Sequence, residues 1–335
     1  MTGRDPRARP PLTIYPMLNR RHLRVKVLQS LYAFFQSGND DLASGEKELL
    51  YGIEKIYDLY LYQFLLLSEI LHQASRQLEE NRSKRLPTSQ DLHPNTRFVD
   101  NACLQAVATD PVLAKLCRER KISWNNDLDL VRKLLAHIRQ QRYYQEYMEK
   151  PAGTFRDDTD LVIRMVKKDL MHFELLHHYY EEKSIYWLDD WELVNKMIIK
   201  TLLSTGEGEA GLSLLSLFKD PEDKAFGIEL FRRTILNQGD LDGIIAARTQ
   251  NWDIDRIALM DIIIMKMALT EILSFPAIPV KVSLNEYIEL SKMYSTPKSK
   301  VFINGVLDKL VEEFVAQDKI NKHVKGLPGN PAAEE

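Results

Sequence analysis

Three arginines near the start of the chain, Arg20, Arg21 and Arg24, have the side chains best suited to bind a ligand. Guanidinium groups bind phosphate oxygens through paired hydrogen bonds, and Tyr32 offers a ring on which an unpaired base can stack. Residues 6–39 hold six basic residues and no acidic one, so this segment carries +6 and leaves −9 on the rest of a chain of net charge −3. Such asymmetry is typical of polyanion binding, although a solvated basic tail explains the composition equally well.

A helix must position these arginines. Asn19 is a good N-cap residue, and the pattern predicts a helix from there to about Gln36. Its buried stripe comprises apolar residues at helical spacing: Leu23, Val27, Leu31 and Phe34. Positive charge at a helix N-terminus opposes the helix dipole, so helix stability does not account for the arginines. We expect them to be unneutralised and available to RNA.

The remaining sequence predicts helices throughout. Glycine and proline number 14 each in 335 residues, about 8%, which is low against the roughly 12% of average proteins. Long amphipathic patterns run from residue 40 to residue 220, with breaks at 86–95, 150–155 and 204–211, and a stripe of aromatic residues at 46–78 is read as core. The fold class is therefore all-α.

The last third is the best punctuated part of the chain. An almost wholly apolar helix over 255–273 predicts the central element of a bundle. Ser283 and Glu286 predict a capping box for the next helix, and Thr296 with Pro297 predicts the start of the last one. Gly305 lies inside that last helix, where glycine costs about 1 kcal/mol against alanine, so we expect it to permit close helix packing.

Other chemistry is poorly supported. Gly206, Gly208 and Gly211 match G-x-G-x-x-G but follow a helical pattern rather than a strand, and no phosphate loop or nucleophile elbow occurs. His177 and Glu181 have metal-binding spacing without a third ligand. We expect no enzyme activity, no cofactor and no metal. Two cysteines without a signal-type segment or a membrane span predict a cytoplasmic protein.

Four segments resemble one known family. They are N-R-R-H-L-R-V-K-V-L-Q-S-L-Y (19–32), K-M-A-L-T-E-I (266–272), V-K-V-S-L-N-E-Y-I-E-L-S-K-M-Y (280–294) and F-I-N-G-V-L-D-K-L (302–310). Together they are similar to the NusB family of transcription antitermination factors. F-I-N-G-V-L-D following the N-E-x-I-E-L helix is the most specific of these elements.

The resemblance implies a NusB-like helical bundle formed by residues 17–38 and 222–316. Members of the family are ordinarily shorter, so residues 39–221 would be a long inserted helical region. Independently of the resemblance, the four prolines of residues 1–16 predict a disordered basic arm, with Met17 as an alternative translation start, and we expect a flexible tail at residues 317–335.

The implied function is binding of boxA-type RNA in nascent ribosomal transcripts together with NusE, a ribosomal small-subunit protein, within the transcription elongation complex. The arginines of the first helix and Tyr32 correspond to the RNA contacts, Asp261 corresponds to a NusE contact, and Asn304 and Gly305 are read as structural. Two alternatives stay open, a helical interaction scaffold without RNA binding and an RNA methyltransferase. The second lacks a glycine-rich motif for the methyl donor and a catalytic cysteine motif.

Overall fold

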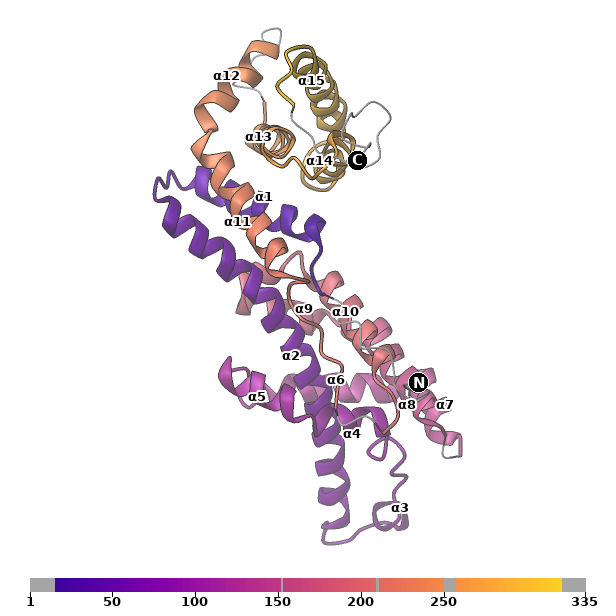
Figure 1. The fold of residues 1–335 in the computed structure, drawn as a ribbon. Helices are drawn as coiled ribbons and strands as arrows, with labels where there is room; N and C mark the ends of the chain where they lie inside the picture. The colour runs from indigo at the N-terminus through magenta and orange to yellow at the C-terminus, as the bar shows by residue number, and fades with distance from the viewer. Residues whose placement is uncertain (1–15, 152, 209–210, 250–256, 321–335) are drawn as a thin grey trace, which may run out of the picture. The chain divides into compact units, whose positions relative to one another are not determined.

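The computed structural model describes residues 16–151, 153–208, 211–249 and 257–320. Within these ranges the structure is helical, and the only β-type pairing is an isolated bridge between Pro16 and Ser216. The all-α expectation is confirmed (Figure 1). The arm expected at residues 1–16 falls almost entirely outside the described residues, as does most of the tail expected at 317–335.

The chain divides into two compact units, one comprising residues 1–17 and 54–217 and the other residues 18–53 and 218–335. The boundary at residues 53/54 lies within a single long helix, α2 (Leu42–Arg82), whose first turns belong to the second unit and whose later turns belong to the first.

The second unit is an all-helical bundle around α13. The central helix α13 packs against α1, α11, α12, α14 and α15. It is buried almost all round, as its apolar sequence predicts. The bounds are α1 (Arg20–Gln36), α11 (Pro221–Leu236), α12 (Gln238–Arg248), α13 (Leu259–Ser274), α14 (Val280–Tyr294) and α15 (Pro297–Ala316).

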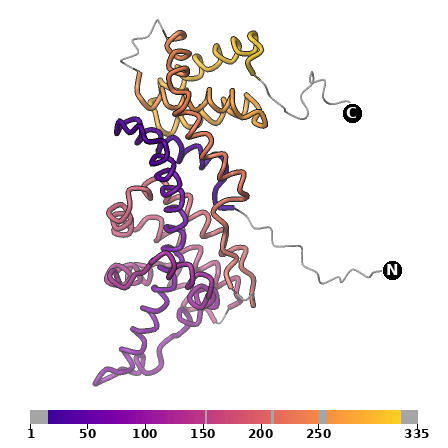
Figure 2. The backbone as a smooth tube through the Cα atoms, turned by 60° about the vertical axis from the view of Figure 1, so that its left-hand side comes forward, coloured from indigo at the N-terminus to yellow at the C-terminus, as the bar shows by residue number. Residues whose placement is uncertain are grey.

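The first unit consists of the later turns of α2 and a series of shorter helices, coloured purple to pink in Figure 2. Tyr60 and Phe64 of α2 are fully buried and their rings contact each other, so this part of the aromatic stripe is core, whereas Tyr51 at its start is 50% exposed. The other bounds are α3 (Ser89–Leu92), α4 (Ala102–Ala108), α5 (Pro111–Glu119), α6 (Leu128–Gln140), α7 (Arg142–Glu149), α8 (Phe155–Met165), the π-helical turn Val166–Leu170, α9 (Glu174–Lys183), the 3₁₀ turn Ile185–Trp187 and α10 (Trp191–Ser204).

Two expectations for the last helices are wrong. Helix α14 begins at Val280 with Pro279 as its N-cap, so Ser283 lies inside the helix and does not cap it. Gly305 lies on the exposed side of α15, and a Cβ placed there would meet no heavy atom within 4 Å. Gly305 therefore does not permit a close helix contact, whereas the predicted cap at Thr296 is confirmed.

Candidate nucleic-acid interface

The first turn of α1 positions the arginines. Asn19 accepts a hydrogen bond from the backbone N–H of His22 at 3.1 Å, and the His22 ring accepts one from the backbone of Asn19 at 3.2 Å. This reciprocal cap satisfies two of the donors that every helix N-terminus leaves open. The cap and the buried stripe of α1 are as predicted. They fix the backbone from which Arg20, Arg21 and Arg24 project.

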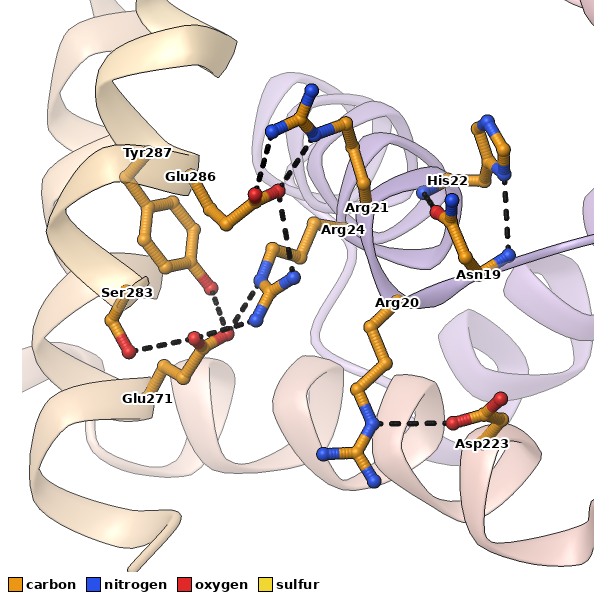
Figure 3. Close-up of polar contacts among 10 residues, drawn as sticks. All are labelled: Asn19, Arg20, Arg21, His22, Arg24, Asp223, Glu271, Ser283, Glu286 and Tyr287. Carbon is orange, nitrogen blue, oxygen red and sulfur yellow. Dashed lines mark hydrogen bonds and ion pairs between the residues drawn. The ribbon is translucent and has the colours of Figure 1, made fainter. Parts of the chain in front are cut away.

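Arg20 and Arg21 are exposed but not unneutralised. Arg20 donates from Nε to Oδ1 of Asp223 at 3.1 Å, and Arg21 forms a two-point pair with Glu286 at 2.9 and 2.6 Å (Figure 3). Their side chains are 40% and 52% exposed. The expectation of unneutralised arginines is wrong, because α11 and α14 bring in carboxylates from more than 200 residues away.

Arg24 has a different environment. Its Nε and terminal nitrogen each donate to Glu271 of α13 at 2.8 Å, and the two side chains are only 4% and 0% exposed. Ser283 and Tyr287 of α14 also donate to Glu271, at 2.7 and 2.9 Å (Figure 3). The expectation that Arg24 presents a free guanidinium to a phosphate is therefore wrong. Arg24 instead joins α1 to α13 and α14.

Glu286 connects the exposed and buried arginines. One of its oxygens lies 3.7 Å from a terminal nitrogen of Arg24, and both accept hydrogen bonds from Arg21. The hydrogen bond and then the charge of Arg21 lower the pKa of Glu286 against the opposing effect of burial. Glu286 is thus an anion at neutral pH, so three arginines face three carboxylates across the contact of α1 with α11, α13 and α14.

A surface cleft of about 490 Å³ opens beside the exposed arginines. No side chain caps the N-terminus of α14, which begins at this cleft. Free backbone N–H groups at a helix N-terminus attract anions. The cleft therefore combines two partly exposed guanidinium groups with an uncapped helix end. Its lining is Asn19, Arg20, Arg21, Arg24, Ala277, Ile278, Pro279, Val282 and Glu286.

The other two predicted contacts have different environments. Tyr32 is 38% exposed and lies eleven residues after Arg21, which places both on one face of α1 about 16 Å apart. Asp261 is only 4% exposed and accepts a hydrogen bond from the Ser295 hydroxyl. The carboxylate is therefore little exposed in the structure, and the NusE contact expected at Asp261 stays a prediction.

Sequence reasoning missed the carboxylates that hold the arginines. Asp223, Glu271 and Glu286 lie on three helices, and no local spacing relates them to α1. It also missed Phe226, whose ring packs against two of the arginines. The Cζ atoms of Arg20 and Arg24 each lie 5.2 Å from the centroid of that ring.

The described residues contain no group of three His, Cys, Asp or Glu that could hold a metal ion. The His177 ring contacts the carbonyl oxygen of Met171 at 2.8 Å, and it is His178 that approaches Glu181, at 3.3 Å. None of the described helices is long and apolar enough to span a membrane.

Comparison with known proteins decides the family. A NusB family model matches residues 189–312. The transcription antitermination protein NusB of Salinibacter ruber is 38% identical over 150 residues, which cover 44% of this chain and 94% of that relative. The chain belongs to the NusB family. No solved structure matches it.

Two other NusB proteins match over shorter stretches. That of Chloroherpeton thalassium is 38% identical over 116 residues, 35% of this chain and 55% of the relative. That of Natranaerobius thermophilus is 42% identical over 81 residues, 24% of this chain and 58% of the relative. The range matched by the NusB family model begins after α1 and does not include Arg20, Arg21 or Arg24.

Proposed function

We propose that this NusB-family chain is an RNA-binding transcription antitermination factor that acts on boxA-type sequences of nascent ribosomal RNA together with NusE. Family membership supports a protein that binds and does not catalyse. The similar proteins are named transcription antitermination proteins. The cleft at the start of α1 and α14 supports RNA as the ligand.

The observation that carries this proposal is that Arg20, Arg21 and the uncapped start of α14 line the same cleft. A guanidinium has five N–H donors, and Arg20 uses its Nε for Asp223. Its terminal nitrogens can donate to a phosphate without disturbing that bond. Tyr32, farther along the same helix, is exposed enough to stack on a base.

Local charge balance shapes how RNA would bind. Because the carboxylates offset the arginines, the cleft does not attract RNA through excess positive charge alone. Arg21 gives its Nε and one N–H of a terminal nitrogen to Glu286, so a phosphate meets either the remaining N–H donors or the face that this carboxylate holds. The site therefore favours a ligand that makes several contacts at once, as an extended single strand does.

The proposed partners follow from the family. They are NusE and the elongation complex, and the buried carboxylate of Asp261 adds no support for a NusE contact at that residue. The scaffold alternative is favoured by the ion-paired state of the arginines, and it predicts no affinity for RNA.

The test is a salt titration of RNA affinity by fluorescence anisotropy, using the full chain and a labelled boxA RNA. Replacing Arg20 and Arg21 by alanine removes two phosphate contacts, so the slope of log K against log salt should fall by about 1.4. The matched control replaces Arg132 and Arg142, two exposed, ion-paired arginines of unit 1, and should leave the slope unchanged. An unaltered slope in the first variant would remove these arginines from the RNA site, and absence of RNA binding by the natural chain would support the scaffold.

A further inference from the structure

A second pocket adjoins the arginine cleft within unit 2. It has a volume of about 390 Å³ and shares Arg20, Ala277 and Ile278 with the cleft. The RNA contacts proposed above involve only the cleft, so this pocket has no assigned role. Its lining is Arg20, Glu222, Ala225, Phe226, Glu229, Ser274, Phe275, Pro276, Ala277 and Ile278.

Aromatic and small side chains form the pocket. The Phe226 and Phe275 rings meet edge to face, with centroids 5.3 Å apart. The Arg20 guanidinium lies 5.2 Å from the centre of the Phe226 ring, while Ala225 and Ala277 are exposed. Phe226 is only 5% exposed and lies under the Arg20 guanidinium, so a flat ligand would find the half-buried ring of Phe275 and, beside it, the plane of that guanidinium.

We infer that this pocket receives one unpaired base of the RNA whose phosphates lie at Arg20 and Arg21. The inference rests on the proposed function. Single-stranded RNA is recognised by bases that leave the stack and lie on aromatic or guanidinium planes. The shared wall places such a base next to the phosphate cleft, so one nucleotide can occupy both.

The acidic rim fixes the orientation of that nucleotide. Glu222 and Glu229 line the pocket, and Glu229 is ion-paired with Arg233. Carboxylates repel phosphate but accept hydrogen bonds from the amino groups of adenine, cytosine or guanine. The phosphate therefore stays on the arginine side and the base enters the pocket. An apolar protein side chain could not use these acceptors, which favours the base as occupant.

The experiment fills the pocket and asks which base is displaced. Ala225→Trp places an indole at an exposed wall position that lines this pocket and not the arginine cleft. RNAs that lack one base at each position in turn are titrated against the natural chain and the variant. Ala247→Trp, at an exposed position of α12, is the matched control, and circular dichroism checks the fold of both.

In the natural chain, removal of one particular base should lower the affinity about tenfold, the typical effect of losing one stacked base. Ala225→Trp should lower the affinity for intact RNA by a similar factor and make removal of that base harmless, while Ala247→Trp changes neither. Undiminished RNA affinity in Ala225→Trp, or a loss that is equal for every abasic RNA, overturns the inference and leaves the proposed function standing. No RNA binding by the natural chain would instead be the failure of the proposed function.

Discussion

Removing either member of the buried pair between Arg24 and Glu271 should destabilise the bundle strongly. In Glu271→Ala the Arg24 guanidinium, 4% exposed, keeps one carboxylate among the described residues, the more distant Glu286 at 3.7 Å. Ser283 and Tyr287 lose their acceptor as well. Loss of one partner of a buried ion pair costs about 3–5 kcal/mol, so we expect the free energy of unfolding to fall by that amount.

Urea denaturation of the full chain, followed by circular dichroism, measures this change. Hydrogen exchange of the α13 and α14 peptides then shows whether the loss is local to unit 2. Arg21→Ala is the control, because an ion pair with a 52% exposed arginine contributes about 1 kcal/mol or less.

A double-mutant cycle tests the coupling itself. Arg24→Ala and Glu271→Ala together should cost about as much as either alone, because the second change removes a charge that the first has already left unpaired. Single variants that each cost under about 1 kcal/mol, or costs that simply add, would refute the reading of Arg24 as a buried structural residue.

The remaining predictions concern packing, acid stability and thiol reactivity. Gly305→Ala should raise the free energy of unfolding by up to about 1 kcal/mol, and with it the thermal midpoint, because the surroundings of Gly305 are open. Gly45→Ala should lower the free energy of unfolding by about 1–3 kcal/mol, because a Cβ there would lie 2.8 Å from the Phe34 ring. The reverse order of the two midpoints would contradict this. The folded-state pKa of Glu286 is depressed, so the contribution of its charge to stability is complete above the unfolded pKa near 4.5 and is lost as pH falls through the folded pKa. Glu286→Gln removes this contribution and should flatten the fall of the unfolding free energy between pH 6 and 3. Equal slopes for the natural chain and the variant would argue against it. Burial raises the pKa of Cys103 to about 11, so iodoacetamide at pH 8 should label this thiol slowly in the native chain and rapidly in urea. Equal labelling rates in the two conditions would contradict this prediction.

The helix caps and the buried stripe that depend on neighbouring residues were predicted from the sequence. The Asn19 cap, the stripe of α1 and the start of α15 at Thr296 depend on residues three or four positions apart, and each has the predicted form. The expected cap at Ser283 was wrong although its spacing is correct. That hydroxyl bonds to Glu271 on another helix, while Pro279 starts α14 a turn earlier.

The candidate site depended more on tertiary contacts. An arginine cluster without nearby acids predicts free charge, but the fold brings carboxylates to Arg20, Arg21 and Arg24 across more than 200 residues. The helix α13 is apolar almost all round, so its sequence could not show that Asp261 points inward. Gly305 illustrates the opposite error, because periodicity alone does not show whether a glycine faces a neighbour or solvent.

The two-point bond between Arg21 and Glu286 means that a carboxylate of the chain itself holds the face of the guanidinium to which a phosphate would bind in the same way. Chloride or a single free phosphate replaces one tethered anion with one that must be captured from solution, and therefore gains little. If the arginines bind RNA as proposed, a polynucleotide brings its next phosphate and base along with the first, and these later contacts would offset the displacement of Glu286. The carboxylate would then favour a chain of phosphates over the small anions around it.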